Sequence, residues 1–103
     1  MSTYLYSQAI DMRAGIDRLL AHVPEAKTGD FYIFCNKNKT RLKVLCIDQF
    51  GIWLSLRRLH QGHFIQSKLQ QPQIQLTDTE WHWLIAGLDW TKLRQNINVK
   101  LEI

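Results

Sequence analysis

Cysteine is scarce in this sequence, and long apolar runs are missing. The two cysteines, Cys35 and Cys46, lie eleven positions apart, and no CxxC pair is present. This spacing excludes a cysteine-built zinc cluster and a disulfide scaffold, so both residues are expected to be buried, reduced thiols. No stretch approaches about 18 apolar residues, which excludes a transmembrane helix, and the first residues do not resemble a signal peptide. We therefore expect a cytoplasmic protein without membrane contact.

Motifs that carry catalysis are also missing. Neither a Gly-rich phosphate loop nor a GxSxG turn occurs. The acidic residues do not gather in the basic segment, and Asp11, Asp48 and Asp78 lie at expected helix starts and turns. His60 and His63 form an HxxH pair, but the sequence nearby offers no further metal ligand. The sequence thus predicts a protein that is not an enzyme, has no catalytic residues and uses no metal or cofactor.

Positive charge is concentrated in the middle of the chain. The 103 residues include 13 Lys and Arg against 9 Asp and Glu, and the net charge is +4. Between Asn36 and Lys68, seven cations face one acid, Asp48, which leaves +6, while the remainder carries −2. A local positive field of this kind is typical of a protein that binds a polyanion such as nucleic acid.

Three strand-like segments follow one another in the same region. They are FYIFCN at 31–36, RLKVLCID at 41–48 and GIWLSLRRL at 51–59. The short polar links between them predict antiparallel hairpins. The residues TYLY at 3–6 predict a further short strand. Those at 97–103 predict a weak strand or a segment that only a partner orders.

One helix is predicted before these strands. Its apolar stripe consists of Met12, Ile16, Leu19, Leu20 and Val23. Asp11 or Ser7 can cap its start and Pro24 ends it, which places Gly15 inside the helix.

A second helix is predicted after the strands and a loop that contains Pro72. Thr77 and Glu80 form a capping box at its start, and Gly87 lies near its end. Its apolar stripe consists of Trp81, Leu84, Ile85 and Leu88. The fold class is therefore α+β, with a three-stranded or slightly larger antiparallel sheet and two helices packed on it. We expect a single domain over residues 1–103.

The register of the first hairpin follows from its link of four residues, 37–40. The link sets Asn36 opposite Arg41 and gathers six apolar residues on one side of the sheet: Phe31, Ile33, Cys35, Leu42, Val44 and Cys46. If the second link continues this pattern, the third strand adds three residues to the same side: Ile52, Leu54 and Leu56. The opposite side then carries Arg41, Lys43 and Arg57 at an end that faces solvent.

Six cations on and beside these strands are the candidate nucleic-acid-binding residues: Lys37, Lys39, Arg41, Lys43, Arg57 and Arg58. Lysine and arginine neutralise phosphates, and the strong charge asymmetry along the chain favours this role. The alternative is a solvated hairpin in which lysines guard an edge strand against pairing.

Four separated motifs resemble one known family. They are DMRAGIDRL at 11–19, FYIFCNKNKTRLKVL at 31–45, the run G-x-W-L-x-L-R-R-L-x-x-G-x-F at 51–64, and LTDTEWHWLIAGLDW at 76–90. Their order and spacing are similar to those of the accessory protein that the second reading frame of bacterial insertion sequences of family sixty-six encodes. This protein is sometimes called TnpB, but it is not the RNA-guided nuclease of that name.

The resemblance implies a non-enzymatic accessory factor for transposition, encoded beside a separate transposase, and it supplies no catalytic residues. DNA is then the expected partner of the six cations. An alternative is a protein adaptor that binds the transposase without DNA contact and uses Trp83, the aromatic residues on the opposite side of the sheet and the C-terminal tail. A third reading is a small basic RNA-cleaving toxin, for which His60 and His63 are the only support.

Overall fold

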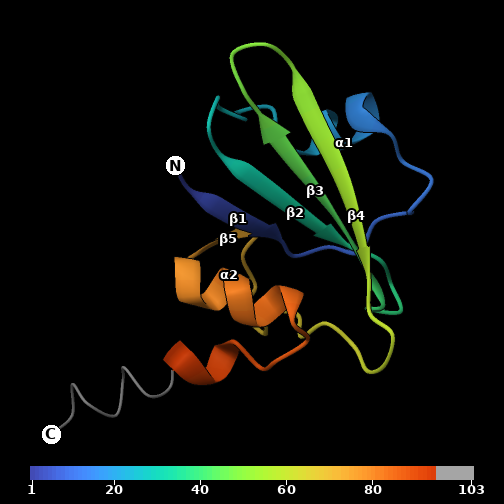
Figure 1. The fold of residues 1–103 in the computed structure, drawn as a ribbon, viewed down its shortest axis with the longest axis vertical. Helices are drawn as coiled ribbons and strands as arrows, with labels where there is room; N and C mark the ends of the chain where they lie inside the picture. Colours follow the sequence, from blue (N-terminus) through green and yellow to red (C-terminus); the bar gives the residue numbers. More distant parts are fainter. Residues whose placement is uncertain (95–103) are drawn as a thin grey trace, which may run out of the picture.

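The computed structural model describes residues 1–94, so the weak strand expected at 97–103 lies outside the described residues. Seven elements follow in chain order: β1 (Thr3–Tyr6), α1 (Ile16–His22), β2 (Phe31–Cys35), β3 (Arg41–Ile47), β4 (Ile52–Arg58), β5 (Gln73–Leu76) and α2 (Asp78–Ile85). A short helical turn at 91–94 comes last (Figure 1). None of the helices in this part of the chain has the length and apolar character needed to cross a membrane.

The five strands form one mixed sheet in the order β4-β3-β2-β1-β5. β1 runs parallel to β2, and every other neighbouring pair is antiparallel. The predicted α+β class is confirmed. The sheet has five strands, which is larger than the three-stranded core of the prediction, and the parallel pair of β1 and β2 corrects the expectation of a purely antiparallel sheet. The strand missed by prediction is β5, in which Ile74 and Leu76 are buried while the alternating Gln73 and Gln75 are exposed. Four residues that directly follow Pro72 give too short a pattern to separate a strand from a loop.

The predicted register of the first hairpin is confirmed. Cys35 lies opposite Leu42, and the pairing continues in step to Phe31 opposite Cys46. Cys35 and Leu42 are buried, so a slip of β3 by one residue would put Arg41 or Lys43 in the place of Leu42.

The predicted facing of the third strand of this meander is wrong. A four-residue turn, 48–51, sets Ile47 opposite Ile52 and therefore Leu45 opposite Leu54. Even-numbered residues of β4 therefore lie on the same face of the sheet as Leu45. This face is opposite to the one that carries Leu42. Asp48 fixes this turn, because its Oδ1 accepts the N–H groups of the residues two and three positions later, both at 2.8 Å.

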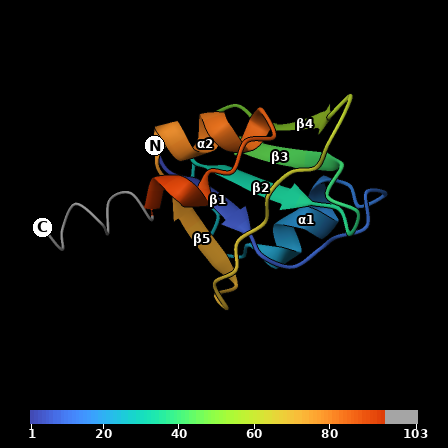
Figure 2. The ribbon, with the colours of Figure 1, turned by 90° about the horizontal axis from the view of Figure 1, so that it is seen from below.

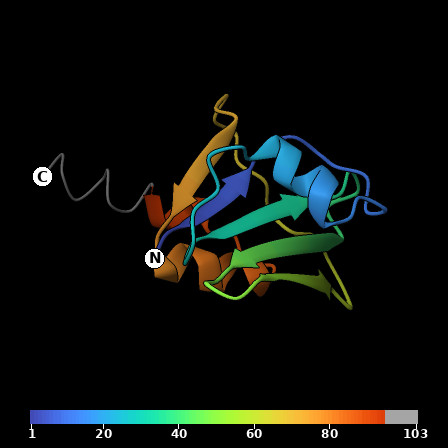
Figure 3. The ribbon, with the colours of Figure 1, turned by 90° about the horizontal axis from the view of Figure 1, so that it is seen from above.

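The two helices cover opposite faces of the sheet (Figures 2 and 3). The α2 face holds a buried cluster made by Leu5, Ile33, Cys35, Leu42, Phe64, Ile74, Leu76, Leu84 and Trp90. The α1 face holds a second cluster made by Ala14, Leu19, Val23, Tyr32, Phe34 and Leu45. The sheet is therefore apolar on both sides, and it is the layer that the two clusters share.

The first helix is shorter than predicted. α1 begins at Ile16 with Gly15 as its N-cap residue, so Gly15 precedes the helix and neither Asp11 nor Ser7 caps it. The Asp11 carboxylate instead accepts the backbone N–H of Arg13 at 2.8 Å. Such a local side-chain bond favours a turn over a helix, which explains the late start.

The second helix begins as predicted. Thr77 Oγ1 accepts the Glu80 N–H at 3.1 Å, and the Glu80 carboxylate accepts the Thr77 N–H at 2.8 Å, which completes the capping box. Gly87 has a φ of 77° and turns the chain after the helix. Leu88 lies beyond this turn and is 51% exposed, so its predicted place in the buried stripe is wrong.

Candidate nucleic-acid interface

The turn between β2 and β3 presents the first cations. Asn36 closes it with its side chain, because Oδ1 accepts the N–H groups of Thr40 (2.9 Å) and Arg41 (3.1 Å). Lys39 adopts a left-handed backbone with a φ of 61°. Both Lys37 and Lys39 are exposed, so the closed turn holds two ammonium groups in solvent.

The segment that leaves β4 lies against this turn. The N–H of Phe64 donates to the carbonyl oxygen of Lys39 at 2.7 Å, and the N–H of Leu59 donates to that of Thr40 at 3.2 Å. Phe64 is 1% exposed and anchors the segment in the core. Residues 19 and 25 positions apart therefore meet at one end of the molecule, where the chain after β2 and the chain after β4 run side by side (Figure 1).

Two arginines face each other at this end. Arg41 opens β3 and Arg58 ends β4, and they are direct partners in the antiparallel ladder. Both residues are exposed. Like charges placed directly opposite each other on paired strands destabilise a sheet, so an anion between them would relieve this repulsion.

The other two predicted site residues are engaged elsewhere. The Lys43 Nζ donates to the carbonyl oxygen of Ala14 at 2.8 Å, and Lys43 is only partly exposed. Arg57 projects from the opposite face of the sheet, where its Nε donates to the carbonyl oxygen of Ile85 at 2.7 Å. The expectation that Arg57 lies beside Arg41 and Lys43 is therefore wrong, because the register of β4 places it beside Leu42.

An open hollow adjoins the turn. It is lined by Lys39, His63, Phe64, Ile65, Gln66, Ser67 and Lys68. Lys68 was not among the predicted site residues, although it belongs to the basic third of the sequence. The structure brings it to the same hollow as Lys39, across 29 positions of chain.

One acid comes close to the basic end. Ile10 donates its N–H to the carbonyl oxygen of Cys35 at 3.0 Å, which brings the neighbouring Asp11 to the end of β2. Asp11 forms an ion pair with Arg13 at 2.7 Å. The hydrogen bond from the Arg13 side chain lowers the pKa of Asp11 from 3.8 to about 2, so the pair stays ionised and adds no net charge.

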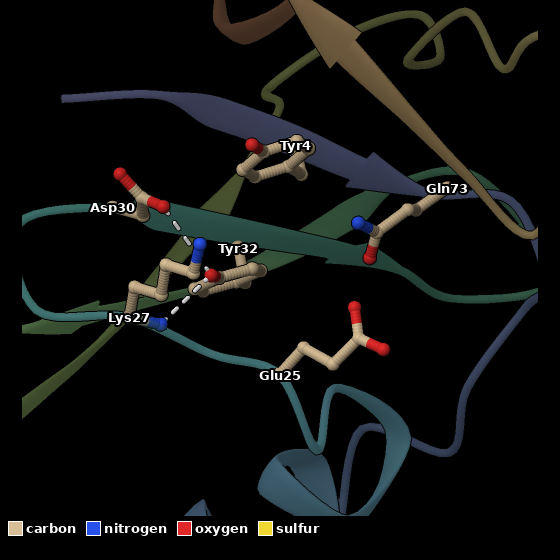
Figure 4. Close-up of a pocket in the computed structure, with 6 residues that line it drawn as sticks. All are labelled: Tyr4, Glu25, Lys27, Asp30, Tyr32 and Gln73. Carbon is tan, nitrogen blue, oxygen red and sulfur yellow. Dashed lines mark hydrogen bonds between the residues drawn. The ribbon is translucent and has the colours of Figure 1, made fainter.

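A second hollow lies at the other end of β2 (Figure 4). It is lined by Tyr4, Glu25, Lys27, Asp30, Tyr32 and Gln73. The rings of Tyr4 and Tyr32 stack with centroids 5.5 Å apart, and the buried Tyr32 hydroxyl accepts the N–H of Lys27 at 3.0 Å. Burial raises the pKa of Tyr32, so this hydroxyl stays protonated and is not a base at neutral pH. Glu25 and Asp30 make this end more acidic than the basic end.

The cysteines and the other possible metal ligands of residues 1–94 lie apart from one another. Cys35 and Cys46 are both free, but only Cys35 is buried as expected, and Cys46 is partly exposed. Burial raises the pKa of Cys35 to about 11, which keeps its thiol protonated. Among residues 1–94, no three histidine, cysteine or acidic side chains lie close enough together to hold a metal ion.

Fold and site together define a small α+β protein, with a mixed sheet between two helices and cations gathered at one end. The chain belongs to the family described as "IS66 Orf2 like protein", whose profile matches residues 1–95. This confirms the resemblance noted from the four motifs and associates the chain with transposition of insertion sequences.

Two relatives come from Sinorhizobium fredii (strain NBRC 101917 / NGR234). "Uncharacterized protein y4jC" is 32% identical over 94 residues, which cover 86% of this chain and 80% of the relative. "Uncharacterized protein y4hO" is 28% identical over 85 residues, which cover 78% of this chain and 74% of the relative. No solved structure matches the chain.

Proposed function

We propose that the protein is a non-enzymatic accessory factor for transposition of an insertion sequence and that it contacts DNA through its basic end. The observation that carries the proposal is the meeting of two distant segments at this end. They present four exposed cations: Lys37, Lys39, Arg41 and Arg58. Family membership supports the setting, because transposition requires proteins that act on DNA ends.

The contact surface consists first of these four side chains. Within residues 1–94, no hydrogen bond or ion pair engages their side-chain nitrogens, so binding a phosphate breaks no internal contact. The opposed pair of Arg41 and Arg58 is the centre, since a phosphate oxygen between the two guanidinium groups replaces repulsion by charge-assisted hydrogen bonds. Lys68 extends the surface along the adjoining hollow. Lys43 and Arg57 contribute positive potential while they hold their internal partners.

Binding of the purified protein to duplex DNA of the element's terminal repeat tests the proposal. The test variant combines Lys37→Gln, Lys39→Gln and Arg58→Gln, which removes three charges from the basic end. Each lost phosphate contact lowers the slope of log K against log salt concentration by about 0.9, so the slope should fall by about 2 to 3. The affinity at low salt should fall with it.

A matched control removes the same charge from the rest of the surface. It combines Arg18→Gln, Lys27→Gln and Lys92→Gln, three exposed cations outside the basic end. The control should keep nearly the whole salt slope of the unchanged protein. Equal losses in both variants would mean that net charge alone attracts DNA, and an unchanged slope in the test variant would remove this surface from consideration.

The adaptor alternative is less well supported by the positions of the side chains. Trp83, its expected anchor, is half-buried and packs against the cluster on the α2 face. The toxin alternative depends on His60 and His63, which lie on the exposed segment after β4. In the part of the chain that the structure describes, no hydrogen bond orients either imidazole. The basic end therefore favours DNA contact over both readings.

A further inference from the structure

The outer edge of β4 is open along its whole length within residues 1–94. β4 has seven residues, contains no proline and pairs with β3 without a bulge. The other edge strand, β5, is only four residues long, and Arg94 Nη2 donates to its Gln75 carbonyl oxygen at 2.6 Å. Proteins usually shorten, bend or cover an edge strand, because its unpaired groups attract a further strand. β5 follows this rule, whereas β4 carries only the charges of Arg57 and Arg58 at its end as protection.

The hydrogen-bonding groups at the open edge follow from the ladder between β3 and β4. Asp48 N–H donates to Gly51 at 2.9 Å and Leu59 N–H donates to Thr40 at 3.2 Å. Hydrogen-bonded pairs alternate along an antiparallel ladder, so the odd-numbered residues of β4 face β3 with their backbone groups. The even-numbered residues therefore direct their N–H and carbonyl groups away from the sheet: Ile52, Leu54, Leu56 and Arg58.

Large apolar side chains are exposed along the same strand. Trp53 is 67% exposed on the α2 face of the sheet, and Leu56 is 60% exposed on the α1 face. Phe50, in the turn just before β4, is 90% exposed. An edge with unpaired backbone groups and exposed apolar residues on both faces is an interaction surface.

We propose that β4 pairs antiparallel with β4 of a second copy of this chain, about a two-fold axis through Ser55. In this register, residues whose backbone groups point outward lie opposite each other, as hydrogen bonding between the two edges requires. Leu54, for example, lies opposite Leu56 of the second copy. Trp53 then meets Arg57 of the second copy at a position without hydrogen bonds, where paired side chains come closest.

This arrangement makes the strand complementary to itself. Nε of Arg57 is held by the carbonyl oxygen of Ile85, which keeps the guanidinium on the α2 face, the face that also carries Trp53. A guanidinium beside an indole gains a cation–π contact. Arg58 meets Ile52 of the second copy, so the arginines of the two chains stay apart. Moving the axis to Arg57 would bring them together, and moving it towards Gly51 would separate Trp53 from Arg57.

We infer that the partner strand belongs to a second copy of this chain because β4 carries both members of the Trp53–Arg57 pair, so the pair forms twice in the dimer. Pairing of two edge strands buries less surface than a standard stable interface, so a weak dimer that depends on concentration is expected. The inference does not depend on DNA binding.

Sedimentation velocity of the full chain over the micromolar to submillimolar range tests the dimer. The test variant is Leu56→Pro, which removes an outward N–H while leaving the bonds to β3 in place. It should weaken self-association at least about tenfold. Leu56→Thr keeps the N–H and serves as the matched control for the loss of the leucine side chain, so it should weaken the dimer less than Leu56→Pro.

A cysteine on the proposed axis gives a second readout if Leu56→Pro does not fold. Residues opposite each other without hydrogen bonds have Cα atoms about 4.5 Å apart, within the range of a disulfide. Ser55→Cys should therefore cross-link into a dimer on mild oxidation, whereas the unchanged chain, with Cys35 and Cys46 only, should not. A monomer at every concentration, a dimer that Leu56→Pro leaves intact, or cross-linking by Trp53→Cys in preference to Ser55→Cys would overturn the proposal.

Discussion

The carboxylate of Glu80 lies in the protein interior, with 3% of the residue exposed, and it serves partners from two parts of the chain. It accepts the Thr77 N–H at the start of α2, and it receives hydrogen bonds from the Arg94 guanidinium. Arg94 also donates to Gln75 of β5. Burial alone would raise the pKa of Glu80, but the hydrogen bonds from Arg94 and Thr77 outweigh it and the pKa is lowered.

Glu80→Gln should lower the free energy of unfolding at neutral pH by about 1.5–3 kcal/mol, because a buried charged hydrogen bond is replaced by a neutral one. A lowered pKa stabilises the fold only while the group is ionised. The contribution is complete above the ordinary pKa of 4.5 and disappears as the pH falls through the lower pKa of the folded state. Urea unfolding between pH 7 and pH 3, at about one-unit steps, should show the two proteins converging in acid. A difference that persists unchanged at the acidic end would contradict this origin.

At the scale of elements, the turn between β2 and β3 depends on one side chain. Asn36 donates to the Thr40 hydroxyl at 3.1 Å and accepts the N–H groups of Thr40 and Arg41. Asn36→Ala leaves those amides without their acceptor and should lower the free energy of unfolding by about 1–2 kcal/mol. Hydrogen exchange followed by NMR should show faster exchange at Thr40 and Arg41. Asn38→Ala, at an exposed position of the same turn, is the control and should leave both amides protected.

The two hairpins explain how far the elements can be predicted from the sequence. In the first hairpin, a wrong register would bury Arg41 and Lys43, so alternation alone decides the pairing. In the second, alternation groups Ile52 with Leu54 but does not choose a face, because both faces of this sheet are apolar under a helix. The facing of β4 is set by the geometry of the Asp48 turn, which polarity does not reveal.

Some residues of the candidate site could likewise be located from the sequence, and others could not. The cations of the turn at 37–43 could be located from the sequence, because local charge and hairpin geometry suffice. The opposition of Arg41 and Arg58 follows only from the register of β4. The approach of Lys68 depends on the segment that Phe64 and Trp90 anchor, since the Trp90 indole N–H donates to the Ile65 carbonyl oxygen at 2.7 Å. Contacts between distant parts of the chain leave no pattern in the local sequence from which they could be predicted.

At the scale of the whole molecule, two core clusters share one sheet. α1 has seven residues and α2 has eight, lengths at which isolated helices are unstable in water. Each helix therefore depends on the face that it covers, and each face depends on the same five strands. A substitution that destabilises one cluster should therefore destabilise the other, so the two clusters should unfold together as a single domain.

Leu45→Ala tests this coupling from the α1 face, where Leu45 is fully buried. The cavity should lower the free energy of unfolding by about 2–5 kcal/mol. Three of the four tryptophans, Trp81, Trp83 and Trp90, pack in the cluster on the α2 face, so tryptophan fluorescence reports mainly on the far side of the sheet.

If the two clusters unfold together, fluorescence and far-ultraviolet circular dichroism should give coincident urea transitions for the variant, shifted equally from those of the unchanged protein. Leu42→Ala, on the α2 face of the same strand, is the matched variant and should behave alike by both probes. A Leu45→Ala transition that moves in circular dichroism but not in fluorescence would mean that the α1 face unfolds separately. The sheet would then separate two cores that unfold independently, and residues 1–94 would not fold as one cooperative unit.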